Sequence, residues 1–176
     1  MSTLRVDTIA NTAGVTNNRV LQIQSTQVST RTSQTTTTSV LAEITGMSVS
    51  ITPLFSNSKI LLQAQWMGEF GGGMDPYNSM FSFKRNDTYL GSPDEGDSRL
   101  YGIMPPAINL TGNEASTPEL SFLMYMDTPS TTSAITYKLS IVGNGGTVYN
   151  NRTVTDGNTV GYERGMSMIT ATEIAQ

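Results

Sequence analysis

The hydrophobic pattern is clearest in residues 47–67, where two alternating segments flank a short connection. In residues 47–52, apolar side chains alternate with Ser and Thr, and a period of two places one face of a β-strand inward and the other toward water. Pro53 cannot donate a ladder hydrogen bond, so the first strand should end there. Residues 59–67 are apolar on one face and mixed Leu, Gln and Met on the other. We therefore expect a central strand with the core on one face and an amide-rich contact, such as a subunit interface, on the other.

The same period of two runs through the rest of the chain, and no segment has a convincing apolar period of 3.6. Asn86-Asp87 predicts a tight hairpin, and Asn144-Gly145-Gly146 predicts another, because these residues tolerate positive φ. Further strands are expected at residues 81–85, 88–90, 120–127, 135–142, 147–155 and 166–174. About eight to ten strands separated by short turns are typical of an all-β fold, an antiparallel β-sandwich of jelly-roll type.

The beginning of the chain has little apolar content of its own. Residues 1–28 contain two short alternating pieces, which we interpret as an N-terminal arm that needs a partner, either the body of the domain or another chain. Residues 29–39 are almost entirely Ser and Thr, which favours an extended link or an exposed edge strand. The predicted organisation is therefore an arm (1–28), a link (29–39) and a β-sandwich domain (40–176).

Two stretches are expected to be loops. Residues 68–78 are rich in Gly, but no Lys follows at the spacing of a phosphate-binding loop and no helical pattern follows either. We interpret the stretch as a loop at one end of the sandwich. Residues 101–118 contain three Pro and are expected to form a long irregular connection, and such loops on a rigid sheet often carry recognition.

Composition narrows the function classes. Charged residues make up 14% of the chain, against about a quarter in typical domains. The 10 basic residues are scattered and the net charge is −4, so we do not expect a nucleic-acid partner, which would require clustered cations. We also expect no signal peptide and no membrane insertion, because no apolar run is long enough for either.

The chain has no Cys and no His. Disulfides, thiolate nucleophiles, Ser-His-Asp triads and ordinary zinc sites are therefore excluded, and we expect no cofactor. Residues 92–98 place Asp94, Glu95 and Asp97 close together, but the EF-hand spacing is missing, so a solvated acidic loop is expected and metal binding stays open.

Several sequence stretches together resemble fibre-like virion proteins of tailed bacteriophages, of the type that infects marine and cyanobacterial hosts. The stretches that carry this resemblance are residues 2–14 (STLRVDTIANTAG), 20–24 (VLQIQ), 44–53 (ITGMSVSITP), 56–62 (SNSKILL), 83–91 (FKRNDTYLG) and 164–174 (RGMSMITATEI). The resemblance spans most of the chain, and its motifs are structural rather than catalytic.

The resemblance implies a non-enzymatic structural protein located in the virion, with a β-domain displayed as a homotrimer. It implies that Leu4, Val6 and Ile9 anchor the protein to other virion proteins, because they stand in the matching opening. It leaves open whether the protein is a tail fibre used for host attachment, a capsid-borne fibre, or a decoration protein that clamps neighbouring subunits.

If the protein binds a receptor, a cell-surface glycan or protein is the expected partner. Aromatic rings stack on sugar faces and carboxylates accept hydrogen bonds from hydroxyls, which makes Asp75, Tyr77 and Tyr101 in the predicted loops the candidate receptor-binding residues. A carbohydrate-cleaving tailspike is the remaining alternative. It would need two carboxylates about 5 to 10 Å apart, and neither Asp94 with Asp97 nor Asp75 with Glu69 is singled out by its spacing.

Overall fold

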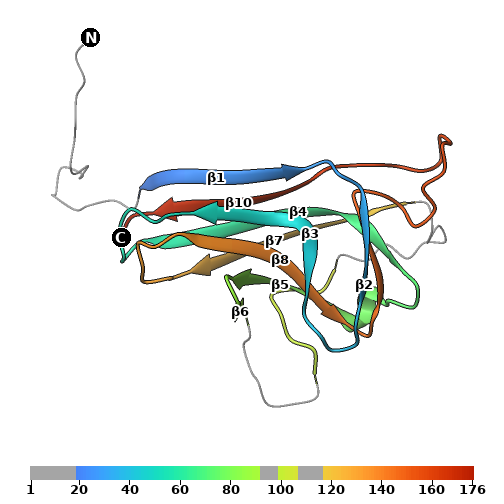
Figure 1. The fold of residues 1–176 in the computed structure, drawn as a ribbon, viewed down its shortest axis with the longest axis horizontal. Helices are drawn as coiled ribbons and strands as arrows, with labels where there is room; N and C mark the ends of the chain where they lie inside the picture. The colour runs from blue at the N-terminus through green and yellow to red at the C-terminus, as the bar shows by residue number, and fades with distance from the viewer. Residues whose placement is uncertain (1–18, 92–98, 107–116) are drawn as a thin grey trace, which may run out of the picture.

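The computed structural model describes residues 19–91, 99–106 and 117–176. Over these residues the chain is an antiparallel β-sandwich of two sheets (Figure 1), which confirms the predicted all-β fold class. The strands are β1 (Val20–Val28), β2 (Thr32–Thr36), β3 (Ala42–Ile51), β4 (Lys59–Gly71), β5 (Ser79–Arg85), β6 (Thr88–Leu90), β7 (Glu119–Asp127), β8 (Ile135–Gly143), β9 (Gly146–Asn150) and β10 (Ser167–Ile174). Within the described ranges, the single helical element is the 3₁₀ turn η1 (Pro76–Asn78).

Strand β4 lies at the centre of the six-stranded sheet, as its two partly apolar faces predicted. On one side it pairs with β7, and on the other with β10 along its first half and β9 along its last residues. Strands β1 and β2 then pair with β10 and β9. The second sheet has four strands in the order β3-β8-β5-β6, so each layer contains strands from both halves of the chain.

The predicted hairpin at residues 144–146 is wrong. Strand β8 pairs with β3 and β5 in one sheet, whereas β9 pairs with β2 and β4 in the other, so this turn carries the chain across the sandwich. A Cβ at Gly146, whose φ is +136°, would lie 2.3 Å from the Met74 amide nitrogen. Glycine is therefore needed at position 146 because the chain is tightly packed where it crosses from one sheet to the other. The hairpin at Asn86-Asp87 is confirmed, with Arg85 paired to Thr88 and Asn86 at a φ of 49°.

The prediction that the Gly-rich loop begins at residue 68 is also wrong, because β4 continues to Gly71 and pairs there with β9. A Cβ at Gly68 would lie 2.1 Å from the Tyr149 carbonyl oxygen and 2.4 Å from the Trp66 ring. Glycine is needed at this position because the strand and the indole approach closely, not because the chain turns.

The sandwich begins earlier than the predicted boundary at residue 40. Both β1 and β2 are strands of the six-stranded sheet, and Asn151 Nδ2 fixes the break between them by donating to the Val28 and Thr30 carbonyls at 2.8 and 3.0 Å. Of the two partners considered for the arm, its described part pairs with the body of the domain. Of the two structures considered for residues 29–39, the stretch contains an edge strand, β2. The anchoring positions Leu4, Val6 and Ile9 lie outside the described residues, as does the acidic stretch 92–98.

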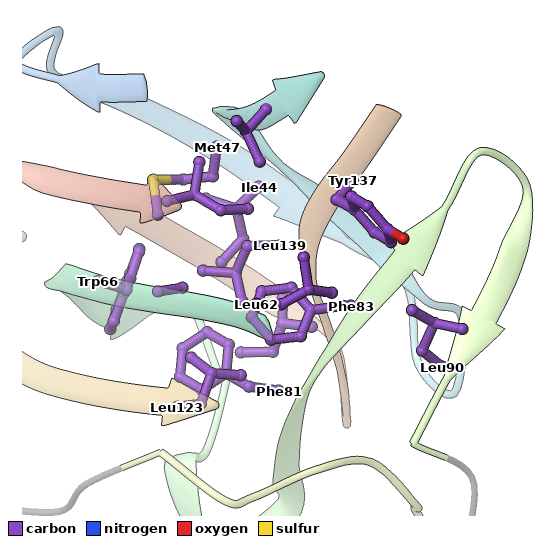
Figure 2. Packing of buried hydrophobic residues seen from close by; sticks show 14 of the residues in the cluster. Ile44, Met47, Leu62, Trp66, Phe81, Phe83, Leu90, Leu123, Tyr137 and Leu139 are labelled. Atoms are coloured by element: carbon purple, nitrogen blue, oxygen red, sulfur yellow. The ribbon is translucent and has the colours of Figure 1, made fainter. Parts of the chain in front are cut away.

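The core fills the space between the two inner faces (Figure 2). Trp66 of β4 and Phe81 of β5 come from opposite sheets, are fully buried, and have ring centroids 5.2 Å apart. At one margin of the core, Arg85 Nη1 donates to both carboxylate oxygens of Asp127 at 2.9 and 3.1 Å, and the Tyr137 hydroxyl donates to the same carboxylate at 2.6 Å. Burial, reinforced by this carboxylate, raises the pKa of Tyr137. This partly buried ion pair joins β7 of one sheet to β5 of the other, and the Tyr137 hydrogen bond joins it to β8.

Candidate functional site

The outward side of β7 is more apolar than its buried side. Leu120, Phe122, Met124 and Met126 are exposed by 51%, 51%, 55% and 44% of their surface. The alternate positions Ser121, Leu123 and Asp127 are buried, and Tyr125 is partly buried against the core. In a strand that served only as a cover for the sandwich, the larger apolar set would face the core. The reversed placement leaves a row of large apolar side chains in contact with solvent.

Strand register joins this row to the outward residues of the neighbouring strands. Met126, Met124, Phe122 and Leu120 stand opposite Leu61, Gln63, Gln65 and Met67 of β4, and Met168 of β10 stands on the far side of Gln65. We call this set the outer apolar face; its members are Leu61, Gln63, Gln65, Met67, Leu120, Phe122, Met124, Met126, Met168 and Thr170. None of these side chains is charged.

The chemistry of the outer apolar face suits contact with another macromolecule. Contiguous exposed apolar patches are uncommon on monomers and mark interaction surfaces, and methionine side chains adapt their shape to a partner. Its amides remain able to bond laterally, as Gln63 Nε2 does to Met124 Sδ at 3.6 Å. Within the described ranges β7 pairs with β4.

A loop covers one end of this same sheet side. Residues 151–166 connect β9 to β10, and their Val154 amide donates to Glu69 Oε2 at 2.5 Å. Arg152 lies over the Tyr149 ring at 5.1 Å, and Gly165 packs directly against the Met67 side chain. The loop therefore reaches the outer apolar face at Met67, while the β7 side chains of that face remain exposed.

The two predicted receptor residues Asp75 and Tyr77 lie together in the turn before β5. The Asp75 side chain caps η1, accepting from the Tyr77 amide at 2.9 Å and from Asn78 Nδ2 at 3.0 Å. Tyr77 is 63% exposed. The carboxylate is thus engaged in holding the turn, and the tyrosine ring is accessible beside it.

The third predicted residue, Tyr101, belongs to a different place. It borders a cavity of about 360 Å³ whose lining is Ser39, Leu41, Tyr89, Arg99, Leu100, Tyr101 and Val142. The Tyr89 ring lies 5.6 Å from the Tyr101 ring, and its hydroxyl donates to the Tyr101 carbonyl at 2.6 Å. Burial raises the pKa of Tyr89. Asp75 and Tyr77 do not line this cavity, so the structure does not unite the three residues in one site.

The carboxylates of Glu69 and Asp75 have separate hydrogen-bond partners. Glu69 is 4% exposed, and burial raises its pKa to about 7, with the Glu119 carboxylate adding to the shift and the Val154 amide opposing it. Asp75 caps η1 in the next turn, and the contacts of the two carboxylates share no residue. The pair Asp94 and Asp97 lies outside the described residues.

Two further properties concern only the residues that the structure describes. They contain no group of three or more acidic side chains that could hold a metal ion. They also contain no helix with the length and apolar character needed to cross a membrane. Comparison with known proteins gives no family: no family model matches the chain, and no curated protein matches it.

Proposed function

We propose that this chain is a non-enzymatic structural protein of a virion, of the fibre type, whose β-sandwich assembles with copies of itself through the outer apolar face. The observation that carries the proposal is that β7 turns Leu120, Phe122 and Met124 away from the core. The resemblance to phage fibre proteins supplies the virion and the trimeric state.

Symmetry explains why such a face would carry no charge. Close to a three-fold axis, identical residues of the subunits approach one another, and two like charges brought close together repel. Side chains such as Met, Leu and Gln meet their own copies without this repulsion. The outer apolar face has this composition over three adjacent strands.

The position of the amino-terminal segment is compatible with attachment to a particle. Strand β1 is an outer strand of the six-stranded sheet, and the residue before it, Arg19, accepts a hydrogen bond from the Ala175 amide at 2.9 Å. Both ends of the described chain therefore meet at one end of the sandwich (Figure 1). Anchoring by Leu4, Val6 and Ile9 from this end would leave the opposite end, with its longer loops, directed away from the particle.

Two measurements test the proposal. Native mass spectrometry of the full chain is expected to show three times the 19.0 kDa mass of one subunit. Immunogold labelling of phage particles is expected to place the protein on the virion, and its position on the tail or the capsid separates a fibre from a decoration protein. A monomer at every concentration would reject self-assembly, and unlabelled particles would reject the virion role.

A further inference from the structure

Three arginines converge on one carboxylate at the junction between the edge strands and the loop of residues 151–166. Arg31 Nη1 donates to Asp156 Oδ2 at 2.5 Å, and Arg164 Nε donates to Asp156 Oδ1 at 2.7 Å. Arg152 Nε lies 3.7 Å from Asp156 Oδ2. Pairing of Thr32 in β2 with Asn150 in β9 brings the segments that carry Arg31 and Arg152 side by side.

The cluster has an excess of positive charge. Three guanidinium groups and one carboxylate leave a local charge of +2 in a protein whose net charge is −4. Consistent with this, the arginines, the Arg164 hydrogen bond foremost, lower the pKa of Asp156. One carboxylate cannot compensate three guanidiniums, so the cluster retains affinity for a further anion.

The cationic groups are held in place and remain accessible. Arg152 donates to the Thr153 and Val154 carbonyls at 3.0 and 2.9 Å, which fixes its guanidinium. The side chains of Arg31 and Arg164 are 45% and 41% exposed, while that of Asp156 is 14% exposed. A guanidinium carries five N–H donors, and the hydrogen bond to Asp156 uses one of those of Arg31.

An open depression adjoins the arginines, with room for more than a bare ion. Its volume is about 570 Å³ and its lining is Ser29, Thr30, Arg31, Arg152 and Asp156. The backbone at Thr30 is fixed by the buried Asn151 amide. Hydroxyls beside cations and a carboxylate acceptor match the groups of a sugar acid, because its ring hydroxyls need both donors and acceptors while its acid group needs guanidinium.

We propose that this depression binds an acidic saccharide, with the acid group on Arg31 and Arg152 and the ring hydroxyls on Ser29, Thr30 and Asp156. The site is built entirely from one chain. It does not depend on the proposed self-assembly, and it is distinct from the predicted receptor residues Asp75, Tyr77 and Tyr101.

Isothermal titration of the full chain with trigalacturonate tests the proposal, with the methyl ester of the same trisaccharide and sodium sulfate as matched probes. Trigalacturonate is expected to bind. Its neutral ester is expected to bind at least about tenfold more weakly, since a charge-assisted hydrogen bond contributes enough free energy for such a factor. Rising salt should weaken the binding of the acid.

Variants locate the site. Arg31→Ala is expected to weaken trigalacturonate binding about tenfold, and Arg31→Lys to restore part of it because the charge returns without the planar fork. Lys138→Gln removes one cation from the other sheet and is the control that should leave binding unchanged. Circular dichroism confirms that each variant is folded.

Three results would overturn the proposal. The first is absence of trigalacturonate binding, which would mean that the arginines only hold the loop. The second is equal binding of the methyl ester, and the third is sulfate binding as tightly as the acid, which would reveal a simple anion site.

Discussion

The two outer faces of the sandwich are built on the same alternation of side chains and differ completely in chemistry. On the four-stranded sheet, Glu43 accepts from Lys84 and Lys138, each at 2.8 Å, and Ser50 bonds to Thr136 at 2.9 Å. On the six-stranded sheet, the outer apolar face has methionine, leucine, phenylalanine and glutamine and no ionised group. The first is an ordinary hydrated surface, whereas the second has the character of an interface.

The difference means that water stabilises the two outer faces of the sandwich unequally. Hydration stabilises charged and hydroxyl groups on one side, so that side can face solvent at no cost. On the other side, contact with water is unfavourable in proportion to the exposed apolar area, by about 25 cal/mol per Å². We therefore expect changes on the two faces to have unequal consequences.

The largest effect is expected from charges placed within the outer apolar face. Phe122→Lys combined with Met124→Lys should abolish the proposed trimer, because an unpaired buried ion costs several kcal/mol. The fold should stay intact, since both positions are exposed in the subunit. Native mass spectrometry measures the oligomer and circular dichroism the fold. Ser50→Lys with Thr136→Lys on the other face is the matched control. If both pairs leave the trimer unchanged, the outer apolar face is not the interface.

The next effect concerns the ion pair that ties the two layers together. Asp127→Ala leaves Arg85 and the Tyr137 hydroxyl without their shared acceptor in a largely buried position. Loss of one partner of a buried pair costs about 3 to 5 kcal/mol, which chemical denaturation would measure as a lower free energy of unfolding. A loss below about 1 kcal/mol would show that the pair is effectively hydrated.

A smaller, pH-dependent effect is expected at Glu69, on the end of the six-stranded sheet that the loop covers. Its pKa is about 7 when folded and 4.5 in the unfolded reference, so the folded state holds the proton more tightly between these values. Stability from this group is therefore greatest at low pH and falls as pH rises through 7, by up to about 3 kcal/mol at 1.36 kcal/mol per pKa unit. Glu69→Gln should remove this fall.

Unfolding midpoints at pH 5 and pH 8 measure the Glu69 effect. The wild-type chain should lose stability relative to Glu69→Gln between these two values, because the amide does not ionise. An equal pH dependence of the two proteins would mean that Glu69 is solvated despite its position under Val154.

The sequence predicted the strands well and their assignment to sheets poorly. Alternation is a local property, and it identified β3, β4, β7, β8 and β10 directly. Which sheet a strand joins depends on how a turn packs: Asn144-Gly145 has hairpin chemistry, but crowding of Gly146 against Met74 belongs to a crossing between layers. The Gly-rich loop was wrongly predicted to begin at Gly68 for the same reason, since glycine is required there by a contact with Tyr149 of the distant strand β9.

The sequence predicted the candidate surfaces only in part. Two apolar faces were visible in residues 120–127, but alternation alone does not tell which face is inside when both contain large apolar groups. Register was needed to show that Phe122 and Gln65 are neighbours. The arginine cluster was invisible in the sequence because Arg31 and Arg152 are far apart in the chain and meet only through the pairing of β2 with β9.

The smallest effect is expected at the ion pairs of the hydrated face. Glu43→Gln removes the partner of Lys84 and Lys138, and exposed pairs of this kind contribute about 0.2 to 1 kcal/mol. Hydrogen bonds from Lys138 and Lys84 lower the pKa of Glu43, so its contribution is present above the unfolded value of 4.5 and is lost as pH falls below it. Denaturation at pH 7 and pH 3, in low and high salt, measures it. Because the pairs are open to solvent, high salt should bring the variant and the wild type together; a loss of several kcal/mol that salt does not reduce would mean that this face, too, is buried against a partner.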